Sequence, residues 1–221
     1  MTQREKRENA PATGSCSVQW ILFDFGGVIA EEGFVAGLKT LARRSGADPE
    51  EAVAAGHRLV YSTGYLLGKS EESAFWEAMR REAGLAGTED EMRETVLAAF
   101  QIRPRMLDLV RRIRERGGLA GILSDQVDWL DALDERNDFY PLFNRVFNSF
   151  HIGRSKRDEG TFRYVSEQLG TNPENILFID DSRDHVERAR SEGMHAIRFS
   201  GPDELLRDMD PFCPGIGQKL P

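Results

Sequence analysis

The sequence has few cysteines, no long apolar run and no excess of basic residues over its 221 positions. Its two cysteines, Cys16 and Cys213, stand near opposite ends without a metal-ligand spacing, so we predict neither a zinc site nor a disulfide framework. No apolar run approaches the length of a membrane span, which argues against a membrane protein. Residues 1–19 also lack the apolar segment of a secretory signal. We therefore expect a cytoplasmic protein.

Acidic residues outnumber basic ones by 37 to 29, which gives a formal net charge of −8. Nucleic acids and anionic membranes attract basic surfaces, so we expect neither as the main partner. An acidic protein can still bind a small phosphorylated molecule where the charge of its site is locally positive. With 40% hydrophobic and 30% charged residues, the composition is typical of a globular protein. Its length suits one domain, or one domain with a sizeable insert. We expect a monomer or a homodimer.

Among the residues that are present, the stretch WILFDFGGVI from Trp20 to Ile29 is the most informative. Four apolar residues lead into Asp24, which is followed by Phe25, Gly26 and Gly27. A short apolar run that ends at glycine predicts a strand of a parallel sheet, buried on both faces. The carboxyl end of such a strand is where α/β proteins bind ligands. There Asp24 can be a nucleophile, a metal ligand or both, or it can simply cap the next element.

The rest of the chain divides into a helical stretch and a stretch of alternating strands and helices. Residues 31–100 contain no convincing strand and have apolar residues at helical spacing. Beyond them, apolar strands at 119–123, 175–179 and 196–199 alternate with helices, and 145–149 is a further short strand. This alternation predicts an α/β fold, a three-layer Rossmann-like parallel sheet with an inserted helical cap. The expected parts are a flexible tail (1–17), a core (18–30 and 101–210), a helical cap (31–100) and an irregular tail (211–221).

Three predicted strands end in polar residues, namely Asp24, Ser124-Asp125 and Asp180-Asp181. Strand ends in a parallel sheet lie along one edge, so we expect these side chains to converge. Crowded carboxylates repel one another unless a cation lies among them, and hard oxygen ligands favour Mg²⁺. Taken alone, each acid could instead cap the helix that follows it, and Ser124 could be a turn residue.

Lys156 lies in a loop before a predicted helix. A lysine in that place can balance the carboxylates and bind a phosphate oxygen. The alternative is a solvated surface charge, because Arg154 and Arg157 flank it and basic loops usually face water.

The order of these residues, from about 18 to 199, resembles that of the haloacid dehalogenase (HAD) superfamily. The stretch DFGGV that begins at Asp24 looks like the nucleophile motif of that family. Ser124 looks like its second motif, Lys156 like its third, and Asp180-Asp181 like its acidic fourth. The helical stretch looks like the small cap of the family. Together with DFGGV, it is similar to sugar-phosphate phosphatases and to epoxide-hydrolase-type phosphatase domains.

The resemblance implies a Mg²⁺-dependent phosphatase that acts on a small phosphate ester through an aspartyl-phosphate. Its catalytic residues would be Asp24 as nucleophile, with Ser124 and Lys156 holding the phosphoryl oxygens. The implied phosphate-binding residues are Phe25, Gly26, Ser124, Asp125 and Lys156. The implied Mg²⁺ ligands are Asp24, the main-chain carbonyl of Gly26 and Asp181, with Asp180 also at the metal site.

Gly26 departs from the family pattern, which has there a second aspartate that acts as general acid and base. Such help is worth about 10²–10⁴-fold in rate, so we expect activity that is slow, limited to good leaving groups, or absent. Asp125 could compensate, or its charge could weaken phosphate binding. Two alternatives stay open: a 2-haloacid dehalogenase, which attacks carbon with the same aspartate and needs no metal, and a non-catalytic binding protein.

Overall fold

The fold is described from a computed structural model, for residues 16–218. Within these residues, five strands form one sheet in the order β3-β2-β1-β4-β5, with every neighbouring pair parallel. The strands are β1 (Trp20–Phe23), β2 (Leu119–Ser124), β3 (Arg145–Asn148), β4 (Ile176–Asp180) and β5 (His195–Arg198). The predicted parallel α/β sheet is confirmed, including the short strand before Ser149.

The apolar run before Asp24 forms β1, the central strand, which pairs with β2 on one side and β4 on the other. Ile21 and Phe23 belong to the larger apolar cluster of the core, whereas Trp20 and Leu22 belong to a second one. Successive side chains of a strand point to opposite faces, so β1 is apolar throughout because both of its faces are covered.

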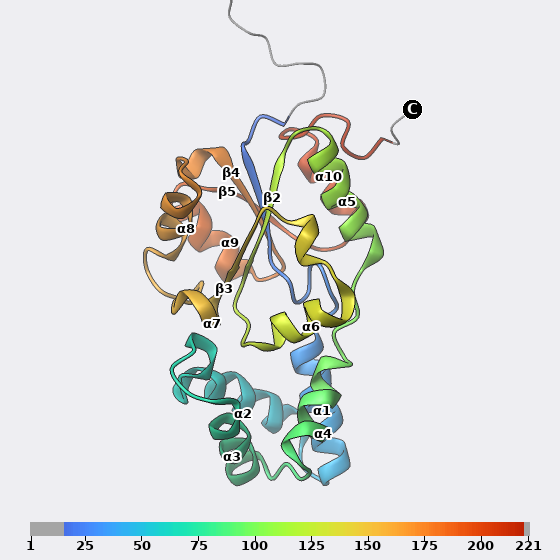
Figure 1. The fold of residues 1–221 in the computed structure, drawn as a ribbon, viewed down its shortest axis with the longest axis vertical. Coiled ribbons are helices and arrows are strands. Elements are labelled where there is room, and N and C mark those ends of the chain that lie inside the picture. The colour runs from blue at the N-terminus through green and yellow to red at the C-terminus, as the bar shows by residue number, and fades with distance from the viewer. Residues whose placement is uncertain (1–15, 219–221) are drawn as a thin grey trace, which may run out of the picture.

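Helices cover both faces of the sheet and complete the three layers (Figure 1). On one face, α5 (Pro104–Glu115) and α10 (Pro202–Met209) supply apolar residues to the larger cluster. On the other face, α8 (Thr161–Leu169) and α9 (Arg183–Ser191) supply Phe162, Val165, Val186 and Ala189 to the second cluster. The short helices α6 (Trp129–Asn137) and α7 (Ser149–Ile152) follow β2 and β3 at their carboxyl ends.

Between β1 and α5 lies a helical unit, which faces the carboxyl ends of the strands (Figure 1). Its α-helices are α1 (Gly33–Ser45), α2 (Pro49–Ser62), α3 (Glu72–Ala83) and α4 (Glu89–Leu97). Trp76 of α3 stacks on Trp129 of α6, and Glu72 Oε1 accepts a hydrogen bond from each indole, at 2.8 and 2.9 Å. These contacts join the unit to the sheet domain. No helix among the described residues is both long and apolar enough to cross a membrane.

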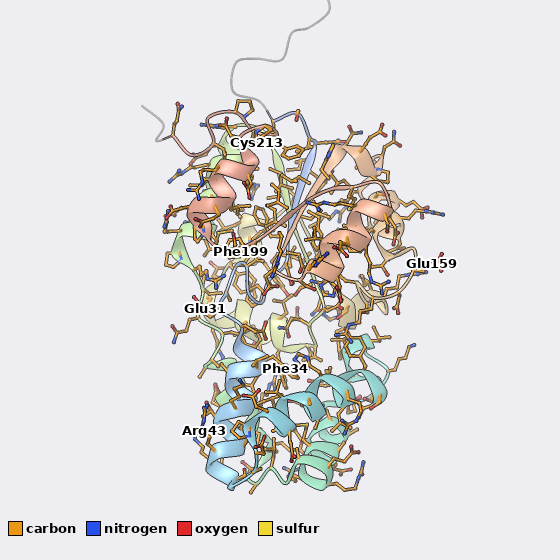
Figure 2. The ribbon with its side chains drawn as sticks, turned by 180° about the vertical axis from the view of Figure 1, so that it is seen from behind. Glu31, Phe34, Arg43, Glu159, Phe199 and Cys213 are labelled. Carbon is orange, nitrogen blue, oxygen red and sulfur yellow. A yellow bond between two sulfur atoms is a disulfide. The ribbon has the colours of Figure 1, made fainter. Side chains whose placement is uncertain are left out.

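A disulfide joins Cys16 to Cys213, so our expectation of no disulfide is wrong. The start of β1 and the segment after α10 meet at the end of the sheet opposite the helical unit, where Figure 2 labels Cys213. Residues 211–218 contain no helix or strand, yet Cys213 and Ile216 are fully buried in the core. Ser17 N–H donates to the carbonyl of Phe212 at 2.7 Å. Residues 1–15 and 219–221 of the expected tails lie outside the described residues.

Candidate active site

The carboxyl ends of β1, β2 and β4 bring Asp24, Ser124 and Asp180 together. Ser124 Oγ donates to Asp24 Oδ1 at 2.9 Å, although the two residues are 100 positions apart. Lys156 Nζ lies 2.8 Å from Asp24 Oδ2 and 2.6 Å from Asp180 Oδ2. All four residues are buried. The structure therefore assembles one compact group from four separate segments of the chain.

Asp24 is held in a fixed orientation by donors on both of its carboxylate oxygens. Besides the hydroxyl of Ser124, Oδ1 accepts the main-chain N–H of Phe25 at 2.7 Å. Burial raises the pKa of Asp24 well above its ordinary value, and the carboxylates of Asp180 and Asp181 add to the rise. The ammonium of Lys156 opposes this effect. The Asp24 carboxylate thus depends on nearby positive charge to remain ionised.

Lys156 is buried, so the alternative of a solvated surface charge is wrong. Asp125 positions the lysine: its Oδ1 accepts the main-chain N–H of Lys156 at 2.8 Å. Its Oδ2 accepts the hydroxyls of Ser155 at 2.7 Å and Tyr61 at 3.0 Å. Both carboxylate oxygens of Asp125 are therefore used to order the loop before α8.

Lys156 and Asp180 form a buried ion pair. Burial opposes the charge of Lys156, but Asp180 and Asp24 outweigh it and raise the pKa of the ammonium. Burial likewise opposes the charge of Asp180, but Lys156 and His185 lower the pKa of this carboxyl below its ordinary value. Asp180 Oδ1 accepts the Ser182 N–H at 2.7 Å, and Oδ2 also lies 3.2 Å from His185 Nδ1. Both oxygens of Asp180 therefore have protein partners.

The two glycines after Phe25 have different roles. Gly27 takes a φ of +79°, and a Cβ there would overlap the carboxylate of Asp181. Asp181 thus lies against the turn, and burial together with Asp180 raises its pKa. Gly26 has no positive φ, but a Cβ there would lie 2.9 Å from Glu32 Oε2. The backbone conformation therefore requires glycine at position 27, whereas at position 26 the carboxylate of Glu32 leaves little room for a side chain.

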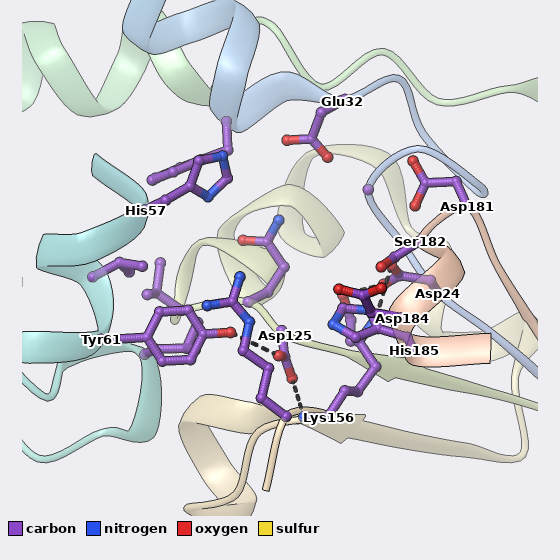
Figure 3. Close-up of a pocket in the computed structure, with 18 of the residues that line it drawn as sticks. Asp24, Glu32, His57, Tyr61, Asp125, Lys156, Asp181, Ser182, Asp184 and His185 are labelled. Atoms are coloured by element: carbon purple, nitrogen blue, oxygen red, sulfur yellow. Dashed lines mark hydrogen bonds and ion pairs between the residues drawn. The ribbon is translucent and has the colours of Figure 1, made fainter. Parts of the chain in front are cut away.

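These groups open onto a cavity of about 530 Å³ between the sheet edge and the helical unit. Figure 3 shows His57 and Tyr61 entering it from the helical unit, opposite Asp24 and Asp181. The volume is typical of sites for small molecules. The cavity wall also includes two arginines, Arg157 and Arg188, and the apolar side chains Phe34, Val60, Leu66, Val127 and Trp129.

The donor set fits a hard divalent cation. The carboxylates of Asp24, Asp180 and Asp181 stand against the one ammonium of Lys156, which leaves excess negative charge at the sheet edge. Ligand atoms of Asp24, Asp180 and His185 lie within 4.8 Å of one another. Carboxylate and carbonyl oxygens are the ligands that Mg²⁺ prefers, so the residues present suit this ion.

Sequence reasoning missed several groups at this site, among them Tyr61, His185 and Glu32. Tyr61 lies on a surface helix whose contact with Asp125 only folding brings about. His185 is in the first turn of α9, and nothing distinguishes it there from a surface residue. Glu32 carried a weak signal, because it closely follows the DFGGV stretch. Desolvation of its carboxylate raises the pKa of Glu32, and the hydrogen bond from the N–H of Val35 opposes the shift.

Two curated proteins illustrate the similarity of this chain to known sequences. Drimenol cyclase drtB from Aspergillus calidoustus is 40% identical over 79 residues, which make up 36% of this chain and 15% of that protein. A phosphatase from Mycobacterium tuberculosis is 29% identical over 163 residues, which make up 66% of this chain and 75% of the relative. The chain thus corresponds to a small part of the cyclase and to three quarters of the phosphatase.

Solved structures support the fold, and a family model covers most of the chain. A HAD family enzyme from Bacteroides thetaiotaomicron, in complex with magnesium and inorganic phosphate, superposes with a TM-score of 0.65 at 19% identity. The match covers 82% of this chain and 94% of that one. The model of the haloacid dehalogenase-like hydrolases matches residues 18–193. Because this match spans well over half of the chain and the fold agrees, the protein belongs to the haloacid dehalogenase-like hydrolase family.

Proposed function

We propose that this hydrolase is a Mg²⁺-dependent phosphatase of small phosphorylated metabolites, with Asp24 as its nucleophile. One observation carries the proposal: Asp24 faces the cavity while Ser124 and Lys156 hold its two oxygens, at 2.9 and 2.8 Å. A carboxylate fixed in this way can attack phosphorus, and its two partners are already beside the place where the phosphoryl group would attach. Phosphoryl transfer is catalysed mainly by such positioning and by charge neutralisation.

In the first step, an oxygen of Asp24 bonds to phosphorus while the ester P–O bond breaks, and the ester oxygen leaves with the electron pair of that bond, which forms an aspartyl-phosphate. Ser124 Oγ and Lys156 Nζ then turn from the aspartate to the phosphoryl oxygens. Main-chain groups of Phe25 and Gly26 contact the same oxygens. Asp125 lines the cavity, but its carboxylate accepts three hydrogen bonds from protein groups. Its proposed role is therefore to position Lys156. Water finally hydrolyses the aspartyl-phosphate.

Asp24, the carbonyl of Gly26 and Asp181 would hold the Mg²⁺, with Asp180 beside them. Asp181 is the better candidate of the two adjacent acids because Lys156, His185 and a main-chain N–H already occupy both oxygens of Asp180. When bound, the ion neutralises negative charge on the transferring phosphoryl group. The magnesium and phosphate in the Bacteroides structure support the same choice of ion and substrate class.

We further propose that the helical unit, taken as residues 31–100, is a cap that selects the substrate. His57 and Tyr61 of α2 line the cavity together with Phe34 of α1. The cavity volume suits a small phosphate ester, as expected from the sequence. A monomeric or homodimeric state stays a prediction. A cytoplasmic location also stays one, and the Cys16–Cys213 disulfide counts against it because reducing compartments disfavour disulfides.

A screen of phosphate esters with and without Mg²⁺, measured as phosphate release, tests this function. Hydrolysis that requires both Mg²⁺ and Asp24, as judged with Asp24→Asn, would support it. The same protein is incubated with 2-haloacids without metal. Halide release there would instead support a dehalogenase, which needs no metal. Binding of Mg²⁺ or phosphate without turnover of any ester would support a non-catalytic binding protein.

A further inference from the structure

The carboxylate of Glu32 occupies the space beside Gly26. A Cβ on Gly26 would lie 2.9 Å from Glu32 Oε2, closer than to any other group outside its own turn. Glu32 and Asp24 line the same cavity, and Figure 3 shows the Glu32 side chain directed into it. Where an aspartate at position 26 would place its side chain, this protein therefore has a carboxylate from a different position.

The chain after Asp24 is fixed in a way that places Glu32 there. The N–H of Ala30 donates to the carbonyl of Phe25 at 2.9 Å, and the N–H of Arg103 donates to the carbonyl of Ile29 at 2.8 Å. Glu32 then caps α1, with Oε1 accepting the N–H of Val35 at 3.4 Å. One oxygen thus serves the helix, which leaves Oε2 facing the cavity.

Glu31, the preceding residue, provides a contrast. Its two carboxylate oxygens form an ion pair with Arg103, at 3.0 Å from Nε and 2.8 Å from a terminal nitrogen. Glu31 does not line the cavity. The two adjacent glutamates therefore have separate surroundings, one paired at the surface and the other at the site.

The other acids around the cavity are less suited to proton transfer. Both oxygens of Asp125 accept protein hydrogen bonds, and Asp180 is paired with Lys156. Asp181 is a proposed metal ligand. Asp184 lies on the first turn of α9 and is not among the groups near Gly26. Glu32 is therefore the acid best placed to act beside the nucleophile.

We propose that Glu32 is the general acid and base of the phosphatase reaction, in place of an aspartate at position 26; this inference rests on the proposed function. In the first step, the bond from Asp24 oxygen to phosphorus forms and the ester bond breaks. The leaving oxygen takes the electron pair of that bond and a proton from Glu32. In the second step, the Glu32 carboxylate removes a proton from water as the water oxygen bonds to phosphorus. The bond to Asp24 breaks, which restores both carboxyl groups and releases phosphate.

The proposal reverses the expectation drawn from Gly26 alone. A site without a general acid would turn over only esters with good leaving groups. With Glu32 as acid, alkyl phosphates should be hydrolysed as well, and the rate should depend only weakly on leaving-group acidity.

The experiment measures kcat/KM for phosphate monoesters of graded leaving-group pKa, at fixed Mg²⁺, for wild type, Glu32→Gln and Glu31→Gln. The amide of Glu32→Gln still has an oxygen for the N–H of Val35 but is not a general acid. It should lower kcat/KM about 10²–10³-fold for alkyl esters and less than about 10-fold for p-nitrophenyl phosphate. Glu31→Gln should keep the wild-type dependence on the leaving group.

Two further variants distinguish loss of the carboxyl group from loss of folding. Glu32→Ser retains a good helix cap without the carboxyl group and should show the same steep dependence as Glu32→Gln. The double variant Gly26→Asp with Glu32→Ser, in which the shorter side chain at position 32 leaves room for a carboxyl group at position 26, should regain at least about 10-fold on alkyl esters over Glu32→Ser.

The possible failures are distinguishable. If Glu32→Gln and Glu32→Ser fold and keep the wild-type dependence on the leaving group, Glu32 has a structural role only and the inference is overturned. An equal loss for aryl and alkyl esters would overturn it as well. The phosphatase proposal survives both results. If wild type hydrolyses no ester with Mg²⁺, both the proposed function and this inference are wrong.

Discussion

Lys156 Nζ lies 2.8 Å from Asp24 Oδ2, and both residues are buried. The same ammonium pairs with Asp180 at 2.6 Å, so one lysine balances acids from two strands. An ion pair in such surroundings is costly to break, because the partner left behind remains buried and charged. The arrangement that would hold a phosphoryl group is therefore also part of what holds the sheet edge together.

Lys156→Met should abolish phosphatase activity and also destabilise the protein. Removal of the ammonium leaves two buried carboxylates without their cation, which should cost about 3–5 kcal/mol of unfolding free energy. Urea unfolding measures the loss. Lys39→Met is the matched control, because Lys39 pairs with Glu50 on the surface. Its loss should change the free energy of unfolding by less than about 1 kcal/mol. Equal stability of the two variants would contradict the importance of the buried pair.

Asp181→Ala should remove the stabilisation of the protein by Mg²⁺. An ion that binds only the folded state raises the unfolding temperature, and the shift vanishes when a ligand is lost. Thermal unfolding with and without Mg²⁺ is the measurement, and it does not depend on turnover. Asp184→Asn, a nearby exposed acid, should retain the shift. A full Mg²⁺ shift in Asp181→Ala would mean that the ion has other ligands, with Asp180 and His185 the first to test.

Asp125→Asn should lower stability and turnover without changing the dependence of rate on the leaving group. The carboxylate accepts hydrogen bonds from Ser155, from Tyr61 and from the main chain of Lys156. An amide accepts these bonds less well, so the free energy of unfolding should fall by about 1–3 kcal/mol. Tyr61→Phe removes only one of these bonds and should have a smaller effect. A steeper leaving-group dependence in Asp125→Asn would instead make Asp125 the proton donor.

Reduction of the Cys16–Cys213 disulfide should destabilise the protein but leave its turnover unchanged below the unfolding temperature. The crosslink spans 197 residues and constrains the unfolded chain, so its loss should cost about 2–5 kcal/mol. It lies at the end of the sheet opposite the cavity (Figure 2). Denaturant unfolding and ester hydrolysis are compared with and without reductant. The variant with both cysteines changed to serine should not respond to reductant, and any response would reveal another effect of the reagent.

Local patterns in the sequence were sufficient to predict the elements around the site. The apolar run before Asp24 predicted β1, and the apolar stretches at 119–123 and 175–179 predicted β2 and β4. Such patterns are visible because side-chain periodicity depends on neighbours a few positions away. The sequence also predicted that strand ends would place Asp24 and Ser124 at one edge, because parallel strands share a direction.

Only the tertiary structure decided which of these groups touch. The hydrogen bond from Ser124 to Asp24 joins residues 100 positions apart, and the Cys16–Cys213 disulfide joins residues 197 positions apart. No local pattern in the sequence predicts a contact between residues so far apart in the chain. The place of Glu32 depends on how the turn after β1 packs against the strand ends and the start of α5. The sequence by itself determined the fold class, the family and the acids at the strand ends. The partners of each acid were decided by long-range packing, because the charge and hydrogen bonding of a buried carboxylate depend on what the whole chain folds around it.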